Sequence, residues 1–318
     1  MRSIHLLAAL ACAFAVGHAQ AQYPTKPIRI IVPFAAGGAG ELGTRIVAQP
    51  LSQALGQPVI VETRPGADGQ IAALETMRAT ADGYTIFAAS GGAMFAIPAL
   101  RKTSPYDPVA DFTPISSFYT STFFVFVHPS VPARSLGELI DYARTNPGKL
   151  SYGSGNMFSI VAMAQLLQQT RTNMVHVPYK GEGPAVLDFI TGRIQVMLAT
   201  PAALLAHLKE GKLRALATAL PQRSSILPDV PTFAEAGFPE PRLVPWGGFV
   251  GPAGLPRNVT ERLSREINLI LKRDDVREKL ASLGSAGRGS SPEELAEFIK
   301  EQVVAWRQGI REAGIPQE

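Results

Sequence analysis

The sequence contains almost no cysteine. Cys12 is the only one among 318 residues, and it lies in an N-terminal segment that we expect to be removed. Lipid attachment at Cys12 is an alternative, but Ala9-Leu10-Ala11 lacks the usual aliphatic residue before it, and apolar residues continue after it. A mature chain without a thiol has no disulfides, thiolate nucleophiles or cysteine metal sites.

Long apolar runs are missing beyond the N-terminus. Met1-Arg2-Ser3, an apolar stretch from Leu6 to Val16 and the small residues Ala19-Gln20-Ala21 follow the order of a secretory signal peptide. We expect residues 1–21 to be this signal, so the mature protein is expected to be exported from the cytoplasm. No later segment has the roughly 18 uninterrupted apolar residues of a transmembrane helix, so we expect a soluble chain.

A strong excess of charge of one sign is also missing. The sequence has 30 Lys and Arg residues against 26 Asp and Glu residues, a formal net charge of +4 that becomes +3 when Arg2 leaves with the signal. The basic residues are dispersed and form no run. We therefore expect no binding to nucleic acid or to an anionic membrane surface.

Patterns typical of catalysis are scarce. After the signal only His128, His176 and His207 remain, and their spacing is unlike that of metal ligands. Tyr152 precedes Gly153-Ser154-Gly155, so the nucleophile elbow G-x-S-x-G is absent. No convincing acid–base pair is visible. We expect no enzymatic activity, no metal and no cofactor.

Short apolar runs alternate with helical patterns through most of the chain. The run Ile28–Val32 precedes a predicted helix over about 41–55, and the rhythm restarts near Phe123–Val127. This alternation is typical of βαβ units, in which helices cover both faces of a parallel sheet. About 297 mature residues suffice for two domains. The sequence predicts an α/β protein of two lobes, each a sheet flanked by helices, with the ligand cleft between them at the carboxyl ends of the strands.

One motif suggests a dinucleotide-dependent enzyme. Gly38-Ala39-Gly40-Glu41-Leu42-Gly43 is a G-x-G-x-x-G directly after an apolar run, and Glu62 follows at about the distance of an acidic ribose ligand. The motif is a weak signal in a chain with 29 glycines. An exported enzyme would also be separated from the cytoplasmic pool of nicotinamide cofactors. This interpretation is therefore the less favoured one.

A set of stretches, in order from Tyr23 to near the C-terminus, resembles the Bug-type extracytoplasmic solute receptors of tripartite tricarboxylate transporters. They are YPTKPIRIIVPFAAGG, VETRPGADGQIA, DGYT, SPYDPVADFTPIS, NPGKLSYGSGN, VPYKGEGPAVLDFITGRIQVML, GKLRALA, LPDVPTFAEAGFP and GFVGPAGLP. The resemblance implies a two-lobed periplasmic binding protein (type II-like) with residues 22–124 plus 242–318 in one lobe and 125–241 in the other. It implies a monomer that closes on a small mono- or dicarboxylate, an aromatic acid included, and delivers it to membrane transporter subunits. Docking of the liganded form on a sensor protein for signalling is the alternative.

The resemblance also implies where the ligand binds. The expected contacts in the first lobe are backbone donors of Phe34, Ala35, Ala36, Gly37 and Gly38, with Glu41 and Ser90. Those in the second lobe are Ser154, Gly155, Asn156, Ser159, Tyr179, Lys180 and Thr200. Residues 34–40 and 153–159 contain no Arg or Lys, so backbone N–H groups, hydroxyls and water are expected to hold the carboxylate.

Several of these roles have open alternatives. Glu41 either orients bound water or a ligand amine, or only complements the helix dipole. Ser90 either donates to the ligand or belongs to a plain turn, and Lys180 either attracts the anion or does nothing specific. The family usually has a longer Gly-Ser-x-Gly-x-Gly-Thr/Ser stretch where this chain has Met157-Phe158. These two side chains either make the pocket less polar or face the core.

Overall fold

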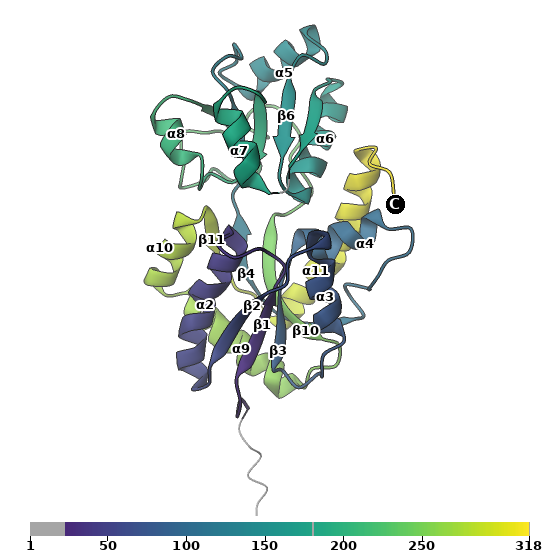
Figure 1. Ribbon diagram of the computed structural model, residues 1–318, viewed down its shortest axis with the longest axis vertical. Helices are drawn as coiled ribbons and strands as arrows, with labels where there is room; N and C mark the ends of the chain where they lie inside the picture. The colour runs from purple at the N-terminus through teal and green to yellow at the C-terminus, as the bar shows by residue number, and fades with distance from the viewer. Residues whose placement is uncertain (1–22, 180, 318) are drawn as a thin grey trace, which may run out of the picture.

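The computed structural model describes residues 23–179 and 181–317, which form two lobes stacked along the long axis of the molecule (Figure 1). The expected signal peptide and Lys180 lie outside the described residues. The first lobe contains a six-stranded sheet of order β11-β4-β10-β3-β1-β2, and the second contains a five-stranded sheet of order β7-β6-β8-β5-β9. We call them the first and the second lobe below.

The strands of the first lobe are β1 (Ile28–Val32), β2 (Val59–Thr63), β3 (Thr85–Ser90), β4 (Phe112–Ser121), β10 (Trp246–Pro252) and β11 (Ser285–Gly287). Its helices are α2 (Ala39–Leu55), α3 (Gln70–Met77), α4 (Ile97–Leu100), α9 (Arg257–Leu271), α10 (Asp274–Ser282) and α11 (Pro292–Glu312). Successive residues of β1 alternate between the two faces. Ile30 packs with α2, α9 and α10, while Ile31 packs with α3, α4 and α11. Both faces of the sheet are therefore covered, which is why β1 and β3 are mostly apolar along their length.

The second lobe has strands β5 (Phe124–Val127), β6 (Ser151–Ser154), β7 (Val175–Pro178), β8 (Val196–Ala199) and β9 (Arg214–Thr218). Its helices are α5 (Leu136–Thr145), α6 (Met157–Thr170), α7 (Glu182–Ile190) and α8 (Leu205–Lys209). Phe124 and Phe126 face the α7 side, whereas Val125 and Val127 face the α5 and α6 side. This lobe is therefore also a three-layer α/β unit.

The prediction of parallel sheets is only partly correct. Strands β1, β2 and β3 are parallel to one another, and so are β6, β7 and β8. However, β10 runs antiparallel to β3 and β4, β11 runs antiparallel to β4, and β5 runs antiparallel to β8 and β9. Strands β4, β10 and β11 were not predicted from the sequence. Pro and Ser interrupt β4, and Gly interrupts β10 and β11, so none of them is a continuous apolar run like β5.

The chain passes between the sheets twice. The first crossing lies between Ser121 and Phe124, and the second lies between Thr218 and Trp246. The two crossings run side by side, because Ser121 N donates to Pro245 O at 2.9 Å and Ala219 N donates to Phe123 O at 2.8 Å. The division of the lobes at residues 124 and 241 stays a prediction.

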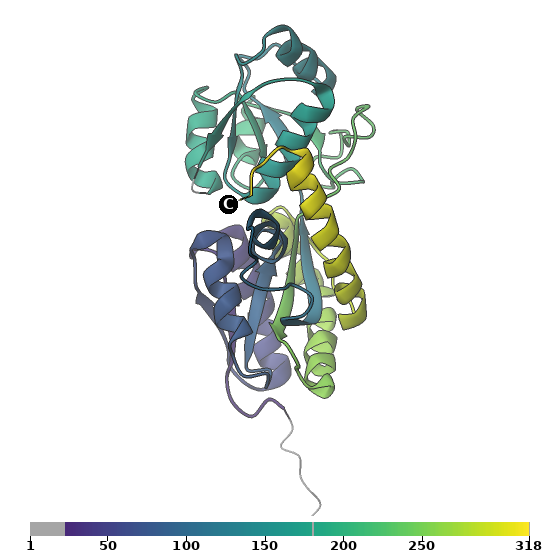
Figure 2. The ribbon, with the colours of Figure 1, turned by 90° about the vertical axis from the view of Figure 1, so that its right-hand side faces the viewer.

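Helix α11 also connects the lobes. It begins with a capping box in which Ser291 and Glu294 each accept a backbone N–H of the other. The helix runs along the first lobe and reaches the second lobe at its C-terminal end (Figure 2). There Gln165 Nε2, on α6, donates to Glu312 Oε2 at 3.5 Å.

Candidate functional site

The carboxyl ends of the parallel strands in the two lobes face each other. In the first lobe Ser90, the last residue of β3, lies opposite Gly247, which follows the second crossing. In the second lobe Ala199, the last residue of β8, lies opposite Phe124, which follows the first crossing. Both edges therefore lie at the junction of the lobes. A Cβ placed on Gly284 of the first lobe would lie 2.9 Å from Pro201 Cδ, so the loop after β8 contacts the first lobe directly.

The loop after β1 makes a tight turn before α2. Gly38 N donates to Ala35 O at 3.3 Å, and Gly37 has a φ of +82°, a value that glycine adopts without the strain of a side chain. Ala35, Ala36, Gly37 and Gly38 are exposed, and Phe34 is half-buried with its ring over Gly40. The backbone of this loop is thus accessible at the junction of the lobes.

Helix α2 begins at this turn with free backbone donors. Within the described residues, the N–H groups of Ala39, Gly40 and Glu41 have no hydrogen-bond partner. Unpaired N–H groups and the positive end of the helix dipole make such a terminus a binding site for anions. The start of α2 therefore offers free N–H groups in a loop without a basic side chain.

Glu41 has a role that neither open interpretation included. Its side chain is only 2% exposed, accepts the N–H of Gly37 at 3.1 Å and pairs with Arg45 one helical turn later. The carboxylate thus fixes the turn by taking one of its donors. Ser90 is half-buried, and its Oγ accepts the N–H of Ala93 at 3.3 Å, which supports the turn that follows β3.

In the second lobe a carboxylate joins three loops. Glu182, the first residue of α7, accepts a hydrogen bond from Asn156 Nδ2 at 2.9 Å. It also accepts bonds from Thr200 Oγ1 at 2.7 Å and from Thr200 N at 3.4 Å. Burial raises the pKa of the Glu182 carboxyl above its usual value, although these hydrogen bonds act in the opposite direction. Asn156 and Thr200 were predicted site residues, whereas Glu182 was missed.

The loops that carry Gly155 and Gly181 lie in direct backbone contact. A Cβ on Gly155 would lie 2.3 Å from Gly181 C and 2.4 Å from Glu182 N, which is closer than atoms can approach. Gly155 is therefore needed for the packing of the two loops, and this contact places Glu182 beside Asn156.

Three predicted polar groups of the second lobe are engaged within the protein. Ser154 is 1% exposed, and its Oγ lies 2.5 Å from Nε2 of His176, whose pKa is lowered by burial. Ser159 is fully buried and donates its Oγ–H to Asn156 Oδ1 at 3.0 Å. Tyr179 donates its hydroxyl to Asp188 at 2.8 Å. In this conformation each of the three hydroxyl groups has a hydrogen-bond partner within the protein.

The Met157-Phe158 stretch lies at the start of α6, which begins at Met157 because Asn156 caps it. Phe158 is 6% exposed and packs against Phe123 of the first crossing, with ring centroids 4.7 Å apart. Met157 is partly buried against the same core. The Phe158 side chain therefore faces the core, and it gives no support for an apolar ligand.

The sequence matches the model of the tripartite tricarboxylate transporter family receptor over residues 44–315. The chain belongs to this family. Protein BugT of Bordetella pertussis is 34% identical to this receptor over 295 residues, which cover 92% of this chain and 90% of BugT.

Solved structures agree with this assignment to the receptor family. A structure described as a periplasmic transporter has a TM-score of 0.83 and 40% identity, covering 93% of this chain and 100% of that one. R. palustris Rpa4515, solved with adipate, has a TM-score of 0.83 and 30% identity, covering 92% of this chain and 99% of that one. The resemblance and the two-lobed α/β fold inferred from the sequence are confirmed. The ligand-binding roles of individual residues stay predictions.

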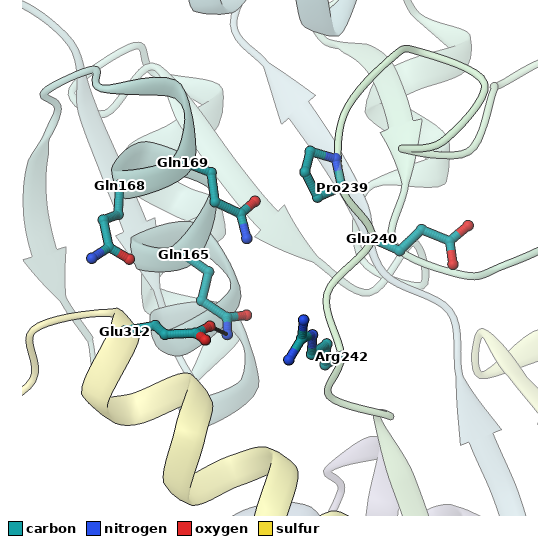
Figure 3. A pocket seen from close by; sticks show the side chains of 7 residues that line it. All are labelled: Gln165, Gln168, Gln169, Pro239, Glu240, Arg242 and Glu312. Atoms are coloured by element: carbon teal, nitrogen blue, oxygen red, sulfur yellow. Dashed lines mark hydrogen bonds between the residues drawn. The ribbon is translucent and has the colours of Figure 1, made fainter.

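The receptor also has a cavity elsewhere on the junction of its lobes. It has a volume of about 270 Å³ and lies between α6, the second crossing and the end of α11 (Figure 3). Its lining residues are Gln165, Gln168, Gln169, Pro239, Glu240, Arg242 and Glu312. None of the predicted site residues belongs to it. Among the described residues, no helix is long and apolar enough to cross a membrane, and no group of acidic or histidine side chains is arranged to hold a metal ion.

Proposed function

We propose that this chain is a periplasmic receptor that captures a small organic carboxylate between its lobes and delivers it to the membrane subunits of a tripartite tricarboxylate transporter. It acts as a monomer and catalyses no reaction. Membership of the receptor family supports the transport role. The adipate in Rpa4515 supports a carboxylate as the ligand class.

The start of α2 is the observation that carries this proposal. The free N–H groups of Ala39, Gly40 and Glu41 lie on a loop without Lys or Arg, at the edge that faces the second lobe. A carboxylate there accepts backbone hydrogen bonds and gains from the helix dipole. Its second end then meets the loops that carry Asn156 and Thr200. Movement at the two crossings closes the lobes around it.

A thermal-shift screen tests the ligand class. The mature protein is unfolded, freed of bound solute and refolded, and then mixed with monocarboxylates, dicarboxylates, amino acids and aromatic acids. A ligand at 100 times its dissociation constant stabilises the folded state by about 2.7 kcal/mol. We expect shifts with carboxylates. Shifts with NAD or a sugar alone would refute the proposal.

A pair of variants tests how the charge is held. The φ of −74° and ψ of 153° at Gly38 suit valine, and its Cβ would lie 3.3 Å from Ala35 O, so Gly38→Val should fold with a small shift of this exposed turn. Its branched side chain stands on the exposed turn and blocks close approach to the backbone donors. Binding should weaken by more than about tenfold, or roughly 1.4 kcal/mol. Lys180→Met should weaken it less. Calorimetry showing intact binding in Gly38→Val and lost binding in Lys180→Met would mean that a side-chain cation holds the anion.

A further inference from the structure

We propose that Glu182 makes this receptor select a ligand with a single carboxylate. The carboxylate binds the first lobe, and the far end of the ligand is uncharged or donates a hydrogen bond toward Glu182. This inference rests on the proposed function and names the ligand class within it.

Glu182 lies at the edge of the second lobe that faces the first lobe. Its carboxylate lies at the carboxyl ends of β6, β7 and β8, because Asn156 follows β6, Glu182 follows β7 and Thr200 follows β8. Thr200 precedes Pro201, which contacts Gly284 of the first lobe. The carboxylate therefore lies at the edge of the second lobe that faces the anion site on α2.

Glu182 occupies the neutral hydrogen-bond donors of the neighbouring loops. Its carboxylate accepts hydrogen bonds from the side-chain amide of Asn156 and from both the N–H and the hydroxyl of Thr200. These neutral donors are the groups that would otherwise receive a second carboxylate of a ligand. A dicarboxylate has to displace Glu182 or place its own charge beside it.

The Glu182 carboxylate is held by neutral groups. Among the described residues, no Lys, Arg or His side chain forms an ion pair with it. Its hydrogen-bond partners among the described residues, Asn156 and Thr200, are neutral. Like charges at a partly buried site repel each other more strongly than in water. Conversely, a hydroxyl at the far end of a ligand can donate to a carboxylate oxygen.

Matched ligands test this selectivity by calorimetry. The series is hexanoate, 6-hydroxyhexanoate and adipate, with butyrate, 4-hydroxybutyrate and succinate as the shorter set. In each set we expect the hydroxy acid to bind at least tenfold more tightly than the dicarboxylate. If the dicarboxylates bind as tightly as the hydroxy acids, the inference is wrong and the proposed function stands. If no carboxylate of either set or of the wider screen binds, the proposed function fails and the inference fails with it.

Variants assign the selectivity to Glu182. Glu182→Gln keeps the shape of the side chain and removes its charge, so dicarboxylate binding should improve at least tenfold while hexanoate binding changes less than about threefold. Glu210→Gln is the matched control. It removes the same charge from the second lobe. Glu210 directly follows α8 and precedes β9, whose first residue, Arg214, pairs with Val127 at the end of β5 that lies away from the crossings. Equal improvement in both variants would overturn the inference.

Two further measurements keep the test decisive. Circular dichroism melting reports whether Glu182→Gln folds, and Glu182→Ala replaces it if the glutamine variant does not. In Lys180→Met the preference for the hydroxy acid should persist. Loss of the preference in that variant would show that Lys180, not Glu182, sets it, and would overturn the inference.

Discussion

The substitution Gly155→Ala tests whether the loops of the second lobe depend on backbone contact. The added Cβ would lie 2.3 Å from Gly181 C and 2.4 Å from both Gly181 O and Glu182 N. These are backbone atoms, so no side-chain rotation relieves the clash. Ordinary contact requires the loops to separate by about 1 Å. Gly155 itself has a φ outside the left-handed region, so alanine suits its backbone conformation.

The expected magnitude follows from what this separation breaks. The hydrogen bond from Asn156 Nδ2 to Glu182 Oε1, now 2.9 Å, would lengthen beyond bonding distance. Overpacking costs about 1–3 kcal/mol, and a lost hydrogen bond to a partly exposed charged group adds about 1 kcal/mol. The reduced entropy of the unfolded chain offsets about 0.5 kcal/mol. We expect a net destabilisation of about 2 kcal/mol.

Denaturant unfolding followed by circular dichroism measures this change, with Gly183→Ala as the control. Gly183 lies two residues into α7, and a Cβ there would meet nothing within 4 Å. Alanine in a helix is favoured over glycine by up to about 1 kcal/mol, so the control should be neutral or more stable. Equal stability of the two variants would refute the argument that the backbone contact at Gly155 holds these loops together.

Two further predictions concern pH and helix capping. His176 has its pKa lowered by burial, so the unfolded chain binds a proton before the folded chain does. The contribution of neutral His176 to the free energy of unfolding should therefore be at its full value above about pH 6.5 and decrease as the pH falls below that value. Melting temperatures at pH 7.5 and 5.5 should differ less in His176→Gln than in the wild type, and an unchanged difference would exclude this residue as the cause. Ser291→Ala removes the cap of α11 and should cost about 1 kcal/mol in denaturant unfolding, whereas Ser282→Ala, on an exposed helix end, should cost less. Equal losses in the two serine variants would contradict the capping argument.

Local patterns in the sequence sufficed for much of the fold. The run Ile28–Val32 is apolar except at Arg29 because both faces of its sheet are covered, so it was recognisable as a buried strand. The start of α11 was recognisable because Ser291 and Glu294 cap the helix from within four residues. The receptor family could also be inferred, because its stretches occur in order along almost the whole chain.

The tertiary structure decided which side chains are available at the junction of the lobes. Ser154 ends β6 and Ser159 lies in the first turn of α6, where ligand contacts were predicted, yet both are buried and hydrogen-bonded. Burial depends on the elements that pack around a residue, so spacing along the chain does not indicate it. The same reason explains why the sequence left two roles open for Glu41, a ligand contact or a first-turn acid, and did not indicate its bond to Gly37.

The network around Glu182 also required the tertiary structure. Asn156 is 26 residues before Glu182 and Thr200 is 18 residues after it, so no local pattern links them. They meet because β6, β7 and β8 are neighbours in one sheet and run in the same direction, which brings their carboxyl ends to one edge. The sequence by itself determined that loops with polar residues follow these strands. Only the order of the strands and the close approach of Gly155 to Gly181 decided that a carboxylate occupies the donors there.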